Sequence, residues 1–470
     1  MEAAYRHPWR PARYWIAGVI GAGVLVVIIA SSILAILFQQ VPARGTIFGL
    51  PAVALVVAAT VFGARALHDH ELASRGRDLA RAGVLLGLGL LLWLLVVDVF
   101  TFTQAAGPGV AAVAALACLP TTAIGLFVVR RLDRNEKEPW RLVMVAVAWG
   151  AIVSTSLVVW VETIWDSVAS RTLVPGPALD VSVAYSAGIW EEVAKGLAVL
   201  LLYLVMRDEF DDVVDGIVYG AAVGLGFNFM ESVTYMTHVY AVFSGEGPGQ
   251  AVFAAASQWY SRQVLGLFFS HATYTALVGA GIGLARQLRR PRNRVVCILS
   301  GFLAAIAAHF AWDAWVAYFP ISSSPFALVE MHLRTVFMQG PFTSMVLVLL
   351  AMGLQVEGNA LGRQLTAEAA SNQGAAGSGT PNCSTNTAAN KTAAPCRTRN
   401  SMVSFIPAGG RQVLRLFLDA LLSIIASSIF AFNVSKSSSS SLRTPLTKIV
   451  GVPPTPLSIP LWISSWTRAA

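Results

Sequence analysis

Four short segments of the sequence place carboxylates and imidazoles inside otherwise apolar stretches. Their ionisable residues are Glu191, Glu192, Lys195, Glu231, His271, His309 and Asp313. A charge at the centre of a bilayer costs at least about 2.5–3.5 kcal/mol, so each of these residues is a candidate for function. Histidine nitrogens and carboxylate oxygens can bind Zn²⁺. The same groups can activate water without a metal, with a glutamate as general base and a histidine polarising the water or the carbonyl.

Both arrangements predict hydrolysis, and two alternatives of another kind stay open. Glutamate and histidine relays also mark the proton paths of membrane transporters, so a proton-coupled transporter is the first alternative. Transporters commonly contain internal repeats and helices broken at the midplane. The sequence contains no convincing repeat, and the candidate site lies off-centre. A non-catalytic scaffold that binds membrane partners is the second alternative.

The elements that must position these residues are membrane-spanning helices. The chain has 470 residues, of which 56% are hydrophobic and only 12% are charged, whereas soluble domains are about a quarter charged. We therefore expect an all-α, polytopic transmembrane bundle embedded in a lipid bilayer. A span needs about 20 mostly apolar residues. This rule predicts ten spans, at about 14–38, 46–67, 79–103, 109–130, 140–162, 183–206, 213–240, 262–288, 295–319 and 327–356.

The basic residues of the connecting loops predict the orientation. Alternate loops hold 18 basic residues on one side of the predicted membrane and four on the other, namely Arg44, Arg171, Arg262 and Arg334. The positive-inside rule then places the N-terminus in the cytoplasm of a multi-pass protein of the cell membrane. The net charge of +8 is thus first a topology signal, and we expect no nucleic-acid partner.

Helix geometry places the candidate residues at one depth. With a rise of about 1.5 Å per residue, Glu191 lies roughly 12 Å below the outer end of its predicted span. His271 is equally far from residue 262, and Glu231 and His309 precede the outer ends of their spans by similar lengths. The first five spans contribute only Asp98. We therefore expect a site in the outer half of the bilayer, on the extracytoplasmic side.

Small residues predict how the helices can approach one another. Gly216, Gly220 and Gly224 form two overlapping GxxxG steps, and Gly279 with Gly283 forms a third. Such steps allow close contact between helix backbones in membranes. They would bring Glu231 close to residues of its neighbouring helices.

The motifs resemble those of the PrsW family of intramembrane proteases, which is related to the group of CAAX prenyl proteases and bacteriocin-processing proteases. The segment 190–195 (WEEVAK) resembles an EExxK motif, and 215–232 resembles DGIVYG followed by FxxxE. Ser270-His271-Ala272 resembles the family's histidine segment, and 309–313 (HFAWD) resembles HxxxD/N. The segment 132–139 (LDRNEKEP) resembles a family lead-in. The resemblance extends over about residues 130–320.

The resemblance implies hydrolysis of a peptide bond in a membrane-anchored substrate protein, such as an anti-sigma factor. Carried over to this chain, it makes Glu191 the base and His271 its partner on the water. His309 and the residue four positions later would stabilise the oxyanion. That residue is Asp313, which can donate to an oxyanion only when protonated, or else orients His309. A metal-dependent mechanism therefore stays open as an alternative. Its first candidate metal is Zn²⁺, with His271, His309 and Glu231 as ligands.

The remaining motif residues receive supporting roles, and the chain divides into three parts. Glu192 and Lys195 are assigned to support, and Glu231 to support or metal ligation. We expect four N-terminal spans in 1–130, a PrsW-like catalytic membrane domain in 131–357 and a low-complexity tail in 358–470. Residues 365–400 of the tail are rich in Ala, Ser, Asn, Thr and Gly, a composition typical of disorder. A hydrophobic stretch at 411–434 could form an extra helix.

Overall fold

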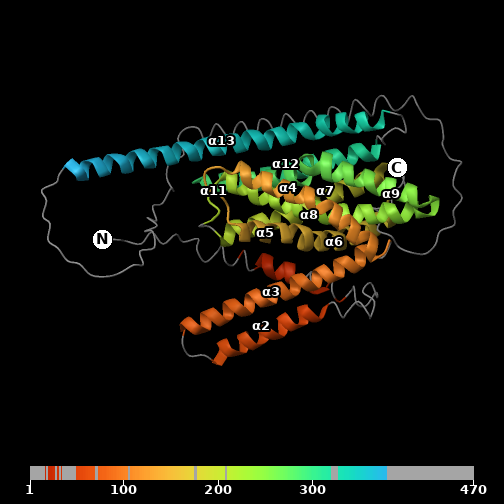
Figure 1. Cartoon of the computed structure of the whole chain (residues 1–470), viewed down its shortest axis with the longest axis horizontal. Coiled ribbons are helices and arrows are strands. Elements are labelled where there is room, and N and C mark those ends of the chain that lie inside the picture. The colour runs from red at the N-terminus through yellow and green to blue at the C-terminus, as the bar shows by residue number, and fades with distance from the viewer. Residues whose placement is uncertain are drawn as a thin grey trace.

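A computed structural model of the chain describes residues 49–68, 72–103, 106–173, 177–206, 209–318 and 326–377, with scattered residues between 16 and 33. Every regular element within these ranges is a helix (Figure 1). The expected all-α class is therefore confirmed. The predicted segment 411–434, and most of the predicted span 14–38, lie outside the described residues.

The helices follow one another with short connections. Their bounds are α2 Leu50–His68, α3 Leu72–Thr103, α4 Pro108–Leu132, α5 Trp140–Ala148, η2 Trp149–Ser154, α6 Thr155–Thr172, α7 Pro177–Val205, α8 Val213–Phe243, η3 Ser244–Glu246, α9 Pro248–Trp259, η4 Tyr260–Leu265, α10 Gly266–Phe269, α11 His271–Gln287, α12 Pro291–Tyr318 and α13 Ala327–Gly377. The elements η2 and η4 are single π-helical turns, and η3 is a 3₁₀ turn.

Seven stretches of the described chain are long and apolar enough to cross a membrane. They are Arg81–Phe100, Pro108–Leu132, Trp140–Thr172, Val213–Glu246, Pro248–Gln287, Pro291–Asp313 and Ala327–Ala369. The 29-residue α7 is not in this set because Glu191, Glu192 and Lys195 lower its apolar character. The apolar part of α2, Leu50–Ala66, is shorter. The chain is thus a multi-pass helical bundle, and the number of ten spans stays a prediction.

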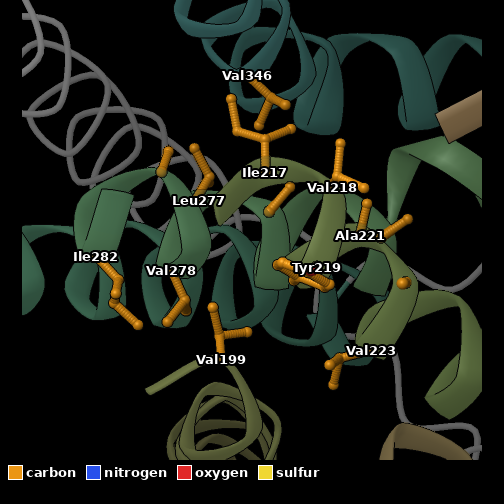
Figure 2. Packing of buried hydrophobic residues seen from close by; sticks show 14 of the residues in the cluster. Val199, Ile217, Val218, Tyr219, Ala221, Val223, Leu277, Val278, Ile282 and Val346 are labelled. Atoms are coloured by element: carbon orange, nitrogen blue, oxygen red, sulfur yellow. The ribbon is translucent and has the colours of Figure 1, made fainter. Parts of the chain in front are cut away.

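Helix α8 forms the centre of the bundle. Of its most apolar window, 94% is buried, and its sides pack against α4, α5, α9 and α11. Figure 2 shows Ile217, Val218 and Tyr219 of α8 in one cluster with Leu277 of α11, Val346 of α13 and Val199 of α7. Such all-round burial explains why α8 is apolar on every face.

Glycines allow α8 and α11 to touch along their backbones. A Cβ atom at Gly216 would overlap the carbonyl oxygen of Gly279, and one at Gly224 would overlap the carbonyl oxygen of His271. These glycines belong to the predicted GxxxG steps, and their lack of a side chain allows the two helix backbones to approach closely. The close packing fixes the start of α11, where His271 stands, against the helix that carries Glu231.

Two long elements flank this centre. Helices α2 and α3 pack together at one edge of the molecule, and α13 runs along the opposite edge and projects beyond the other helices (Figure 1). The predicted tail begins at residue 358, but α13 continues as a helix to Gly377. Residues 358–377 are therefore helical, contrary to the disorder that their composition indicated.

The predicted span 262–288 differs most from the structure. The helical stretch begins at Pro248, contains the π-helical turn η4 and breaks at Ser270, where the backbone leaves the helical conformation. The hydroxyl of Thr273 donates to the carbonyl oxygen of Phe268 across this break at 2.5 Å. His271 is consequently the first residue of a new helix, and not a mid-helix residue as the periodicity suggested.

Buried carboxyl groups gather at the end of the bundle where the lead-in segment joins α4 to α5. Glu138, 4% exposed, accepts a hydrogen bond from the Tyr219 hydroxyl and is hydrogen-bonded to the carboxyl of Asp215. Asp212 caps α8 through the backbone N–H groups of Val214 and Asp215. Burial raises the pKa of Glu138 to about 10, and the neighbouring Asp215 adds to this effect.

The raised pKa of Glu138 predicts a loss of stability at alkaline pH. A carboxyl whose pKa is higher in the folded state stabilises the fold fully below its ordinary pKa of 4.5, and this contribution disappears as pH rises toward about 10. Glu138→Gln stays neutral and can still accept from Tyr219. We expect its melting temperature to fall less between pH 6 and pH 10 than that of the wild type, as measured by thermal unfolding in detergent.

The matched control is Glu246→Gln, which removes an exposed carboxyl in η3. It should follow the wild-type pH profile. Parallel profiles for Glu138→Gln and the wild type would contradict the assignment of the alkaline loss to this carboxyl.

Candidate active site

Lys195 stands at the centre of the predicted site residues. Its ammonium lies 2.6 Å from Glu192 Oε1, 3.2 Å from Glu191 Oε2 and 3.0 Å from His271 Nδ1, and the Phe227 ring covers it at 4.2 Å. An ammonium has three N–H donors, so each donor faces one of these acceptors. Lys195 is completely buried, which makes it the fixed positive charge that holds both glutamates of α7.

His271 connects α11 to α8 and to η4. Its Nε2 lies 2.6 Å from Glu231 Oε2, and the same oxygen lies 2.8 Å from Arg262 Nη1. The Arg262 guanidinium also lies over the Tyr235 ring at 3.7 Å. Because Lys195 can only donate to Nδ1 of His271, these contacts assign the ring proton to Nε2, which faces the Glu231 carboxylate.

His309 of α12 faces three carboxylates. Its Nδ1 lies 3.0 Å from Glu192 Oε1, and its Nε2 lies 3.3 Å from Asp313 Oδ2 and 3.7 Å from Glu191 Oε2. Asp313 follows one turn later on the same face, so it orients this imidazole. With acceptors at both nitrogens, His309 can donate from both only as the imidazolium.

Glu191 lies between the two imidazoles. Its Oε2 is 3.7 Å from His271 Nδ1 and 3.7 Å from His309 Nε2, and the two rings stand edge to face with centroids 5.2 Å apart. The six predicted site residues, contributed by α7, α8, α11 and α12, therefore form one continuous cluster. In the first five predicted spans, Asp98 lies elsewhere, where it accepts a hydrogen bond of 2.7 Å from Ser156.

Four side chains of the cluster form a candidate donor set for a metal. Side-chain atoms of Glu191, Glu192, His271 and His309 lie within 4.8 Å of one another, and nitrogen and carboxylate ligands suit Zn²⁺. This group contains Glu191 and Glu192 in place of the expected Glu231, which pairs with His271 and Arg262 instead. By ligand type the cluster fits Zn²⁺. The Lys195 ammonium, however, contacts three of the four ligands, so a metal would have to displace it.

One charged residue of the site was misplaced by the sequence reasoning, and two buried acidic residues within electrostatic range of the site were missed. Arg262 was counted in an outer loop, but it belongs to η4 and pairs with Glu231. Glu162 and Asp166 of α6 are 3% and 4% exposed, and Glu191 is the charge that acts most strongly on Glu162. The statement that the first five spans contribute only Asp98 was therefore wrong. The i, i+4 spacing of Glu162 and Asp166 in an apolar helix was the signal for them.

Comparisons with known proteins match the chain to one family. Residues 138–350 match the family described as PrsW family intramembrane metalloprotease. A relative named Protease PrsW, from Geobacillus kaustophilus (strain HTA426), is 30% identical over 181 residues, which cover 38% of this chain and 69% of the relative. No solved structure matches the chain significantly.

The family match, the polytopic helical bundle and the buried cluster of glutamates and histidines together identify the class of the protein as a membrane peptidase. The chain belongs to the PrsW family of intramembrane proteases.

Proposed function

We propose that this chain hydrolyses a peptide bond of a membrane-anchored protein with a water molecule activated by Glu191. The observation that carries the proposal is the position of Glu191 Oε2, 3.7 Å from a nitrogen of each histidine. A general base must lie within reach of the water it deprotonates, and a histidine beside it can orient or polarise that water.

The reaction follows from the positions of these side chains. Glu191 takes one proton from water, and the oxygen attacks the carbonyl carbon while the carbonyl electrons move to its oxygen. His271, held by Glu231 and Lys195, orients the water, and Nε2 of His309, oriented by Asp313, faces the developing oxyanion. The C–N bond then breaks, and the proton on Glu191 passes to the leaving nitrogen, which yields a carboxylic acid and an amine.

A bound Zn²⁺ would be held by Glu191, Glu192, His271 and His309 and would supply Lewis-acid polarisation of the carbonyl. The remaining residues act without it as described above. Lys195 and Glu192 hold Glu191 and His309 in place, and Arg262 holds Glu231.

The proposed side of the membrane rests on the loop charges, and the proposed substrate class rests on the family. The loop charges put the cluster in the outer half of the bilayer, so we propose cleavage on the extracytoplasmic side of a single-span protein of the anti-sigma-factor kind. Residues 131–357 form the proposed catalytic domain, since they contain every residue of the cluster and the matched segment 138–350. The helices of 1–130 and the segment 358–470 would lie outside it.

Reconstitution in liposomes tests the proposed function. Purified full-length protein should cleave members of a panel of synthetic single-span peptides, with products identified by mass spectrometry. A transporter would show solute uptake that depends on a proton gradient and no peptide products. A scaffold would bind peptides without products. Either result from correctly inserted protein would contradict the proposal.

A further inference from the structure

The hydrogen-bond donors of the cluster motifs already face acceptors within the protein. The three N–H groups of Lys195 face Glu191, Glu192 and His271, and Nε2 of His271 faces Glu231. Both nitrogens of His309 face carboxylates. Asp313 accepts from His309, so it does not supply the donor that an asparagine would offer. Nε2 of His309 is the one motif donor that faces the oxyanion of the proposed reaction, and it is shared with Asp313. A second donor for the oxyanion therefore has to come from outside the motifs.

Tyr274 of α11 contacts the cluster and has a hydroxyl without a hydrogen-bond partner. Its ring stacks on that of His309, with centroids 5.1 Å apart and an angle of 27° between the planes, and it stands edge to face with His271 at 5.7 Å. The residue is 1% exposed, and its hydroxyl has no hydrogen-bond partner among the described residues. Buried phenol groups normally have a partner, so this hydroxyl is an exception that calls for a ligand.

The two ring contacts place the phenol of Tyr274 on the side of α11 that carries the cluster. The carboxylates of the cluster surround it: the charges that act on the phenol are those of Asp313, Glu192, Glu231 and Glu191. The hydroxyl has no hydrogen-bond partner in the described chain, so it can donate to a substrate oxygen.

We propose that Tyr274 is a catalytic residue whose hydroxyl donates a hydrogen bond to the oxyanion formed from the scissile carbonyl. This inference rests on the proposed peptidase function. The two imidazoles fix the ring from two sides, so the donor is oriented before the substrate arrives, as electrostatic stabilisation of a transition state requires. Tyr274 thereby replaces the donor that Asp313 cannot supply in its ionised form.

Tyr274→Phe is the direct test. The ring and its packing against both histidines stay, and because the hydroxyl has no partner in the protein, its removal leaves no buried group unsatisfied. Loss of one oxyanion donor lowers kcat on the order of 10²–10³-fold. We expect that fall with an almost unchanged KM and melting temperature, measured in liposomes on the peptide that the wild type cleaves fastest. Tyr203→Phe, on the part of α7 that packs against Phe210, should leave both constants unchanged.

Fluorinated tyrosines at position 274 distinguish donation from packing. They change the acidity of the phenol with little change in its shape, so kcat should vary with that acidity if the hydroxyl donates in the transition state. A Tyr274→Phe protein that cleaves within about threefold of wild type, or a kcat that is independent of fluorination, would overturn the inference alone. A wild-type protein that cleaves no peptide would instead overturn the proposed function.

Discussion

Glu191→Gln is expected to eliminate peptide cleavage by a protein that still folds and inserts. The amide has nearly the shape of the carboxylate, and it can still accept from Lys195 at the present 3.2 Å. It cannot take a proton from water. A positioned general base contributes about 10²–10⁴-fold to a rate, so we expect kcat to fall by at least about 10²-fold with KM nearly constant.

The measurement compares single-span peptide cleavage by wild type and variant at equal amounts of monodisperse protein. Glu330→Gln is the matched control, because Glu330 pairs with Arg334 on α13 away from the cluster. It removes a carboxylate of a membrane-associated helix and should leave kcat unchanged. A Glu191→Gln protein that retains more than about a tenth of wild-type kcat would remove Glu191 from the role of base.

The order of motifs and the composition predicted the fold class and the six clustered side chains, because both depend on local sequence. The apolar stretches must be helices in a bilayer, where backbone groups need internal partners. Ionisable residues in such stretches must face one another or a polar cavity. That reasoning placed Glu191, Glu231, His271 and His309 in one layer, and the distances between them show one cluster.

The parts that the sequence did not predict depend on tertiary packing. The π-helical turn η4 rotates Arg262 toward Glu231, and helical periodicity alone cannot indicate such a turn. Arg262 was therefore counted among the basic residues of the connecting loops. The break at Ser270 and the contact of Tyr274 with both histidines likewise arise from the packing of α11 on α8 and α12. Partners of the motif residues are fixed only once neighbouring helices are in place.

Lys195→Met is expected to abolish cleavage and to lower stability strongly. Methionine keeps the apolar stem but removes the ammonium, which leaves Glu191 and Glu192 buried without their shared counter-charge. Breaking a buried ion pair in this way typically costs about 3–5 kcal/mol. The double variant Lys195→Met/Glu192→Gln removes one of the uncompensated charges, so its melting temperature should recover in part while its activity stays absent.

Chelation of the wild type and zinc binding by Lys195→Met together distinguish activation of water by Glu191 from activation of water by a bound Zn²⁺. Because the Lys195 ammonium already contacts Glu191, Glu192 and His271, we expect the wild type to keep its kcat within about twofold after dialysis against a zinc chelator, with metal content measured by mass spectrometry. In Lys195→Met those side chains no longer share a cation, and the variant should bind added Zn²⁺ with a rise in melting temperature. Arg334→Met, which removes an α13 cation distant from the cluster, should gain no zinc affinity. A wild type that loses activity on chelation and regains it with Zn²⁺ would show that the metal, and not Lys195, is the cation of this active site.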